Sequence, residues 1–183
     1  RINRDVSLIY KEPLDSLGIY IDWNCNNIKN VKALIIGPED TPYRYGYYFF
    51  NINFPNEYPH VPPKVSYETR FDKIRFNPNL YTCGKVCISI LNTWSGPQWT
   101  SCQSLKSVLL SLQSILNENP LQNEPGFENA IDNRHESYNS VIEHENINIS
   151  IIRMINNTPH GFEAFKPILR KTFLRNYSKI SNY

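Results

Sequence analysis

The chain has 183 residues, 40% of them hydrophobic, so it is long enough to bury one sizeable core. Its formal net charge of +2 is too small to indicate binding to nucleic acid or membrane, and no apolar run is long enough to span a bilayer. The four cysteines are scattered and complete no zinc-type site with histidine, so we expect no bound metal and a reducing, intracellular compartment.

The first part of the chain predicts a short helix followed by an antiparallel sheet. Residues 3–11 have apolar side chains at helical spacing and stop before Pro13. Four runs rich in β-branched and aromatic residues then alternate with turn sequences. These runs cover residues 18–23, 31–37, 47–54 and 64–69. Because the connections among the first three are short, we expect an antiparallel meander.

Four prolines between residues 55 and 63 rule out a regular central strand there and require a fixed, extended loop. The aromatic-proline step Tyr58-Pro59 lies inside this loop, where a cis peptide bond would cost least. After the fourth run, regular patterning breaks down over residues 72–101. An irregular segment of that length inside a compact domain is usually functional.

Helices are predicted for the rest of the chain. Thr100 and Gln103 resemble a capping box that opens a helix. An apolar stripe at spacings of three and four follows, formed by Leu105, Val108, Leu109, Leu112, Ile115 and Leu116. Two further helices are expected over roughly 136–156 and 161–177. Strands first and helices last, without βαβ alternation, indicate an α+β fold.

Cys87 raises the main chemical question. A free cysteine is most often a small buried hydrophobe, and the apolar residues around it fit that interpretation. Its place at the edge of the irregular segment, after Asn79 and Gly84, instead favours a nucleophile on which backbone amides and a carboxamide converge. A thiol with a pKa of about 8.5 needs no adjacent base to exchange thioesters. A cysteine protease would need a histidine beside the thiol, and His60 is the nearest in sequence.

Several motifs together resemble the ubiquitin-conjugating enzyme family in order and spacing. They are "GPEDTPYRYGYYFFNINFPNEYPHVPPKV", "RFNPNLYTCGKVCISIL", the tryptophan at position 99 and "ILNENPLQNEPG". The similarity runs from the first helix to about Asn157 and is greatest to the Z-type class of the family. It implies a ubiquitin-conjugating fold, with a catalytic core over residues 1–157 and a C-terminal helical extension over residues 158–183.

The resemblance implies an enzyme that accepts ubiquitin or a ubiquitin-like modifier as a thioester on Cys87. The modifier would come from an activating enzyme that consumes ATP, and it would pass to a substrate lysine, usually with a ligase. No cofactor would bind to this chain, and the expected location is the cytoplasm, with the nucleus also open. The alternative is a catalytically silent module that binds ubiquitin or ligases, but such relatives lack the cysteine.

The same resemblance assigns roles around the cysteine. Asn79 matches the asparagine of the family's His-Pro-Asn motif, and would donate to an oxyanion or brace the loop that presents Cys87. Asn77 stands where the family has histidine, and asparagine supplies both a donor and an acceptor there. Pro78 and Gly84 would support the loop. From the residues alone, "NPN" is also typical of an ordinary Asx-Pro turn.

The loop after the central helix departs from the family pattern. Many members carry an acidic residue there that orients or deprotonates the incoming lysine, whereas Gln122 and Asn123 fall nearest in this chain. Neither amide can act as a base. Deprotonation of the lysine would then depend on desolvation near the thioester or on Glu124.

The surfaces that the family uses for partners are also altered. His60 and Val61 stand where the ligase-binding loop carries an aromatic residue, and Ser101 and Cys102 replace a Pro-Ala pair, so standard RING-ligase binding is not expected to carry over unchanged. Arg4 lies on the helix that docks the activating enzyme in the family, or simply on a solvated charged face. The C-terminal helix would pack on the body, or else decide which modifier is used.

Overall fold

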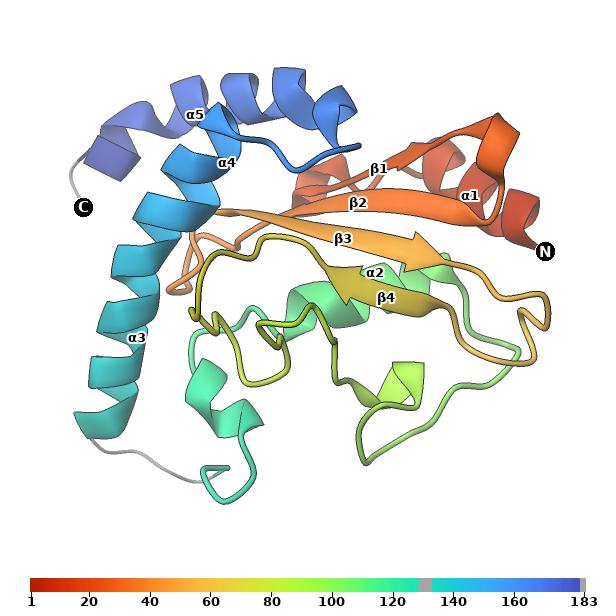
Figure 1. Ribbon diagram of the computed structural model, residues 1–183, viewed down its shortest axis with the longest axis horizontal. Coiled ribbons are helices and arrows are strands. Elements are labelled where there is room, and N and C mark those ends of the chain that lie inside the picture. The colour runs from red at the N-terminus through yellow and green to blue at the C-terminus, as the bar shows by residue number, and fades with distance from the viewer. Residues whose placement is uncertain (129–132, 182–183) are drawn as a thin grey trace.

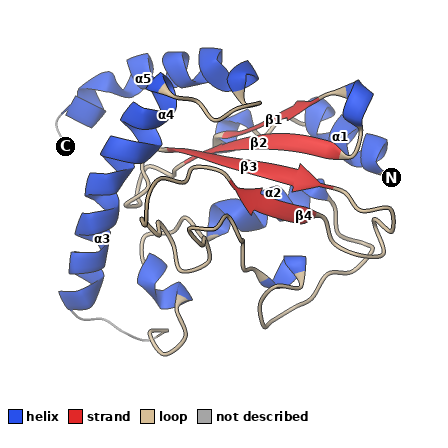
Figure 2. Ribbon diagram, viewed as in Figure 1, coloured by secondary structure: helices blue, strands red, loops and turns tan. Residues whose placement is uncertain are grey.

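The computed structural model describes residues 1–128 and 133–181, and in it the predicted meander is confirmed. Figures 1 and 2 show one antiparallel sheet whose strands follow each other in chain order. The strands are β1 (Ile19–Trp23), β2 (Asn30–Ile36), β3 (Tyr47–Asn53) and β4 (Lys64–Tyr67). Strand β4 ends earlier than predicted because the Thr69 hydroxyl replaces the backbone ladder, accepting from Phe49 N at 2.8 Å and donating to Tyr47 O at 2.9 Å.

The helices also follow the predicted order. They are α1 (Ile2–Lys11), α2 (Leu105–Ser114), α3 (Asn133–Glu145), α4 (Met154–Asn156) and α5 (Lys166–Ser181). A π-helical segment, Asn146–Arg153, joins α3 to α4, and a short 3-10 helix, Glu163–Phe165, precedes α5. Within residues 1–128 and 133–181, no helix is both long and apolar enough to cross a membrane.

The predicted start of the central helix is wrong. Thr100 N donates to Gln103 Oε1 at 3.0 Å, but these two residues close a separate turn ahead of the helix. The helix is capped by Ser104, whose extended backbone, with φ of −139° and ψ of 172°, cannot continue a helix from Thr100. Ser104 and Ser107 form the actual capping box, because serine at the N3 position can reach back to the N-cap backbone as glutamine would.

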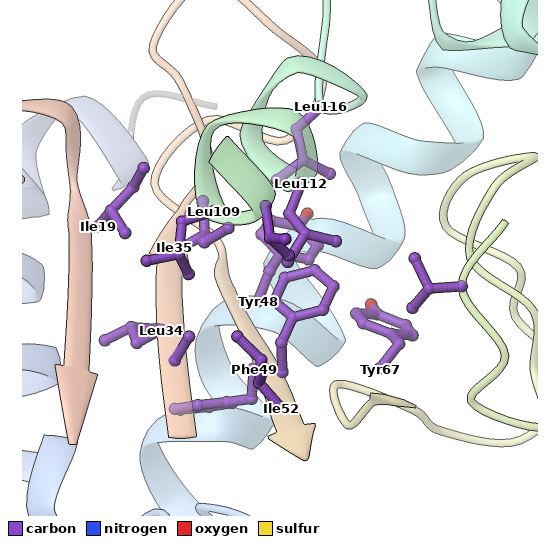
Figure 3. Packing of buried hydrophobic residues seen from close by; sticks show 14 of the residues in the cluster. Ile19, Leu34, Ile35, Tyr48, Phe49, Ile52, Tyr67, Leu109, Leu112 and Leu116 are labelled. Carbon is purple, nitrogen blue, oxygen red and sulfur yellow. The ribbon is translucent and has the colours of Figure 1, made fainter. Parts of the chain in front are cut away.

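Both faces of the sheet are covered. Figure 3 shows the apolar stripe of α2, with Leu109 and Leu112, lying over Ile35 and Tyr48. Successive residues of a strand point to opposite faces, so Phe49 lies on the other face from Tyr48. The C-terminal segment covers this second face, with Phe162 and Phe165 against Phe49, which confirms that the segment packs on the body.

The proline loop is fixed between α1 and the segment before α2. The Tyr58-Pro59 peptide bond is cis, as predicted. The Tyr58 hydroxyl donates to the buried carboxylate of Asp5 in α1, and Trp99 Nε1 donates to Pro59 O at 2.7 Å. These contacts join three segments that are distant in sequence, so the three segments form one connected surface.

Candidate active site

The Asn-Pro-Asn turn is anchored by Asn77, a side chain that is fully buried. Its Nδ2 donates to the Tyr43 hydroxyl at 2.8 Å and to Ile115 O at 2.7 Å, while its Oδ1 accepts from Asn79 N at 2.9 Å. Burial raises the pKa of Tyr43 well above its ordinary value, so the hydroxyl stays neutral and donates onward to Phe76 O. Asparagine thus supplies here the donor and the acceptor that the sequence interpretation required.

We expect Asn77→Ala to lower the free energy of unfolding by about 3 kcal/mol, because the change leaves buried hydrogen-bonding groups of Tyr43, Asn79 and Ile115 without this partner. Equilibrium unfolding in urea measures the loss. The exposed Asn53, which accepts from Asn30 at the end of β3, gives a matched control. Asn53→Ala should change stability by less than about 0.5 kcal/mol. Equal small losses in both variants would contradict the anchoring role.

Asn79 and Cys87 are joined by a pair of hydrogen bonds. Cys87 N donates to Asn79 O at 2.9 Å, and Asn79 Nδ2 donates to Cys87 O at 2.6 Å. Because the carboxamide donor is engaged with the backbone of Cys87, the geometry favours bracing of the loop over donation to an oxyanion. Asn79 is 6% exposed, and its Oδ1 has no hydrogen-bond partner within the described residues.

A small hairpin separates these two residues. Leu80 and Val86 pair as an antiparallel bridge, and Gly84 turns the chain with φ of 93°, a conformation that favours glycine. A Cβ at Gly84 would also lie 3.2 Å from Tyr67 O, closer than side chains usually pack. Gly84 therefore fits the supporting role that the sequence predicted for it.

Cys87 itself is almost wholly buried, at 2% exposure, whereas Cys83 and Cys102 are exposed. In residues 1–128 and 133–181, no histidine nitrogen is hydrogen-bonded to the Cys87 sulfur, and His60 is exposed on the proline loop. The cysteine-protease interpretation therefore lacks the base that it requires. Burial alone also suits a small core residue, so the case for a nucleophile depends on the surrounding loop.

A cavity of about 460 Å³ lies beside this loop, lined by Asn79 and by Ile88, the residue after Cys87. Gln122, Asn123 and Glu128 also line it. The Glu128 carboxylate accepts from Gly126 N at 3.0 Å. Hydrogen bonds from the backbone of Glu128 itself and of Gly126 lower the pKa of Glu128, so this side chain places a negative charge at the cavity at neutral pH.

Glu124 is directed elsewhere. Its carboxylate lies 3.5 Å from Arg75 Nη2 and does not line the cavity. Arg75 also donates to Pro78 O, and its guanidinium lies 4.3 Å from the centroid of the Tyr81 ring. Arg75 therefore ties the Asn-Pro-Asn turn to the loop over residues 120–128.

Neither Arg75 nor Glu128 was predicted from the sequence to belong to the site. Arg75 lies in the motif that begins "RFNPN", two residues before the Asn-Pro-Asn turn. A positive charge so close to the turn could have indicated a role in holding it. Glu128 lies two residues after Gly126, outside the loop in which the family carries its acidic residue. The chain turns at Gly126, and this turn places Glu128 at the cavity.

The residues predicted to bind partners gather on connected segments. Arg1 Nη1 donates to Ser101 O at 3.1 Å, which ties α1 to the segment that carries Ser101 and Cys102. The proline loop, with His60 and Val61, joins the same group through the Trp99 contact with Pro59. The predicted partner residues are exposed; they are Arg4, His60, Val61, Ser101 and Cys102.

A family model described as ubiquitin-conjugating enzyme matches residues 1–144, and the chain belongs to this family. Its relatives include the ubiquitin-conjugating enzymes E2 Z of Xenopus tropicalis and Homo sapiens, each 42% identical over 182 residues and 97% of this chain. The chain spans about half the length of these curated relatives, covering 56% and 50% of them respectively.

Structural comparison supports the same fold. The E2 domain of a ubiquitin conjugating enzyme from Toxoplasma gondii matches with a TM-score of 0.60 at 24% sequence identity. The match covers 82% of this chain and 97% of that chain. The architecture thus agrees with the α+β ubiquitin-conjugating fold predicted from the motifs.

Proposed function

We propose that the chain forms the conjugating domain of an enzyme that carries ubiquitin or a ubiquitin-like modifier as a thioester on Cys87. The observation that carries this proposal is the paired contact of Asn79 with Cys87 in a chain of the ubiquitin-conjugating family. The partners would be the modifier, an activating enzyme that uses ATP, a ligase and protein substrates. The chain itself needs no cofactor for this chemistry, and we place it in the cytoplasm or the nucleus.

The proposed reaction has two transfers. In the first, the Cys87 thiolate attacks the thioester carbonyl on the activating enzyme; a new sulfur–carbon bond forms and the other thiolate leaves. In the second, the neutral amine of a lysine attacks the Cys87 thioester, and the Cys87 thiolate leaves as an amide forms. One proton is lost from the nitrogen. Asn79 and Asn77 keep the loop fixed during both steps, so that little reorganisation is needed.

A charging assay tests this proposal. The chain is incubated with ubiquitin, an activating enzyme and ATP, and the products are separated on gels with and without reductant. An adduct heavier by one modifier that disappears with reductant is the expected result. The assay is repeated with other pairs of ubiquitin-like modifier and activating enzyme. If every pair fails while a positive-control enzyme is charged, the silent binding module becomes the better interpretation.

We further propose that the cavity beside Asn79 receives the acceptor lysine, with Gln122, Asn123 and Glu128 around the amine. Glu128→Gln is then expected to slow discharge of the charged chain onto free lysine by about a hundredfold, the lower end of what a positioned carboxylate contributes to proton transfer. Single-turnover discharge over a range of lysine concentrations and pH values measures the effect. Charging by the activating enzyme should be unchanged.

Glu124→Gln is the matched control, because Glu124 has the same charge on the same loop but contacts Arg75 outside the cavity. We expect this variant to discharge at close to the parent rate. A slow Glu124 variant together with a normal Glu128 variant would reverse the assignment of the carboxylate, and normal rates in both would leave desolvation as the source of deprotonation.

The surface formed by α1, the proline loop and the segment before α2 is the proposed docking site for enzymatic partners. Arg4 would contact the activating enzyme. His60, Val61, Ser101 and Cys102 would contact ligases, with a chemistry different from the aromatic and Pro-Ala residues common in the family.

A further inference from the structure

Helix α5 concentrates the positive charge of the chain. Its basic residues are Lys166, Arg170, Lys171, Arg175 and Lys179, and no acidic residue interrupts them. The whole chain has 19 basic and 17 acidic residues, so the remainder, with five fewer basic residues, has 14 against 17 and a formal charge of −3. The charge on α5 therefore contrasts with that of the rest of the chain.

The outward face of α5 also carries large apolar side chains. Leu174 is 73% exposed and Tyr177 is 57% exposed. Arg170 lies four residues before Leu174 and seven before Tyr177, a spacing that puts all three on one side of a helix. We call Arg170, Lys171, Leu174 and Tyr177 the outer face of α5; Arg175 lies on another side of the helix, where it lines a groove with Tyr20 of β1.

The cations of this outer face have no ion-pair partner in the described part of the chain. Lys179, nearer the end of the helix, pairs with Glu39. Arg170 and Lys171 form no salt bridge with a carboxylate of residues 1–128 or 133–181, and both side chains are exposed. The outer face thus combines unpaired positive charge with exposed apolar surface.

The opposite side of α5 is already occupied. Leu169 and Thr172 are buried, and the Tyr47 hydroxyl of β3 donates to Leu169 O at 3.0 Å. An amphipathic helix binds a membrane by burying its broad apolar face in the lipid interface. Because that face of α5 is packed against the sheet, the helix cannot insert without unfolding the core. Two apolar side chains set among cations better match a protein partner of opposite charge.

We propose that the outer face of α5 docks an acidic, amphipathic segment of a partner protein. Carboxylates of that segment would pair with Arg170 and Lys171, and its apolar side chains would cover Leu174 and Tyr177. Figure 1 shows α5 on one face of the sheet, with the irregular segment that follows β4 on the other side, so the surface is separate from the Cys87 site. It would recruit a partner without contacting the thioester.

The test is an NMR titration of the isotopically labelled chain with a synthetic helical peptide in which glutamates flank leucines at three- and four-residue spacing. A peptide with glutamine in place of each glutamate is the matched probe. We expect shifts to map to the outer face of α5, affinity to fall as salt is raised, and the glutamine peptide to bind more weakly. The double variant Arg170→Glu/Lys171→Glu should bind the acidic peptide about tenfold more weakly or worse.

Lys64→Glu/Lys73→Glu is the control, since it changes net charge equally at exposed lysines away from α5. It should retain peptide binding within a small factor. Equal weakening in both double variants, or no peptide binding at millimolar concentration, would overturn the proposal. So would tighter binding of the parent chain to vesicles of phosphatidylserine and phosphatidylcholine, or to a DNA duplex, than to the peptide. The titration does not depend on charging, so its outcome is separate from that of the proposed function.

Discussion

Cys87→Ser is expected to abolish the reductant-sensitive adduct and to give a reductant-resistant ester or no adduct at all. The thiolate is the reactive form of cysteine at neutral pH, whereas a serine hydroxyl needs an adjacent base to become a comparable nucleophile. No histidine nitrogen is hydrogen-bonded to the Cys87 sulfur in the described residues, so a serine at this position would gain no such help. The charging assay with and without reductant distinguishes the two kinds of adduct.

The expected effect is large. Removal of the nucleophile of a well-studied serine protease costs on the order of a millionfold in kcat, and transfer to lysine through residue 87 should fall beyond detection in the same way. Cys83→Ser and Cys102→Ser are controls, because both cysteines are exposed and outside the Asn79 contact. They should charge normally. A reductant-sensitive adduct that survives Cys87→Ser but disappears with Cys83→Ser would move the nucleophile to Cys83.

The sheet was predictable from sequence because its signals are local. Runs of aromatic and β-branched residues bounded by turns locate β1 to β4 within a few residues, and the short connections require antiparallel pairing among the first three. The end of β4 depends on the Thr69 hydroxyl, which bonds to β3 and ends the ladder. A side chain that replaces a backbone partner leaves no periodic signal.

The C-terminal helices were harder to delimit because tertiary contacts shape them. Over residues 136–156 the sequence predicts one helix, but the chain passes from α3 into a π-helical segment at Asn146. Asn146 is fully buried there, accepting from the Tyr48 hydroxyl at 2.6 Å and donating to Arg44 O at 2.9 Å. Gly46 makes room for it, since a Cβ there would lie 2.0 Å from Asn146 Oδ1. Such a tertiary contact leaves no periodic pattern in the sequence and is visible only in the structure.

The candidate site, too, was predictable from sequence only in part. Cys87 and Asn79 stand in a motif of fixed spacing, and the structure joins them through two hydrogen bonds. The role of Asn79 was open between oxyanion donor and brace, and only the contact of its Nδ2 with Cys87 O favours the brace. Arg75 and Glu128 act across segments separated by some fifty residues, so their contacts follow from the fold and not from spacing.

The boundary at residue 157 between a catalytic core and a C-terminal extension remains a prediction. The packing of the C-terminal segment indicates how far the stability of the two parts is shared. Phe165 is 2% exposed, and its ring centroid lies 6.1 Å from that of Phe49 in β3. Phe162 lies 5.1 Å from the same Phe49 ring, so both aromatics share a buried cluster with the sheet. The family model ends at residue 144, and the hydrophobic core continues across both that point and the predicted boundary.

Phe165→Ala is therefore expected to destabilise the whole chain by about 3–5 kcal/mol, the usual cost of removing a buried aromatic side chain and leaving a cavity. Because the cluster spans the sheet and the C-terminal segment, urea unfolding should remain a single transition shifted to lower denaturant. Leu174→Ala on the exposed face of α5, the helix that follows Phe165, should shift stability by less than about 0.5 kcal/mol. If Phe165→Ala instead produced an early transition confined to helical signal, with the sheet unfolding at its original midpoint, the segment after residue 157 would be an independent addition. The expected single transition would mean that the C-terminal segment is part of what holds the sheet, and with it the Cys87 loop, in place.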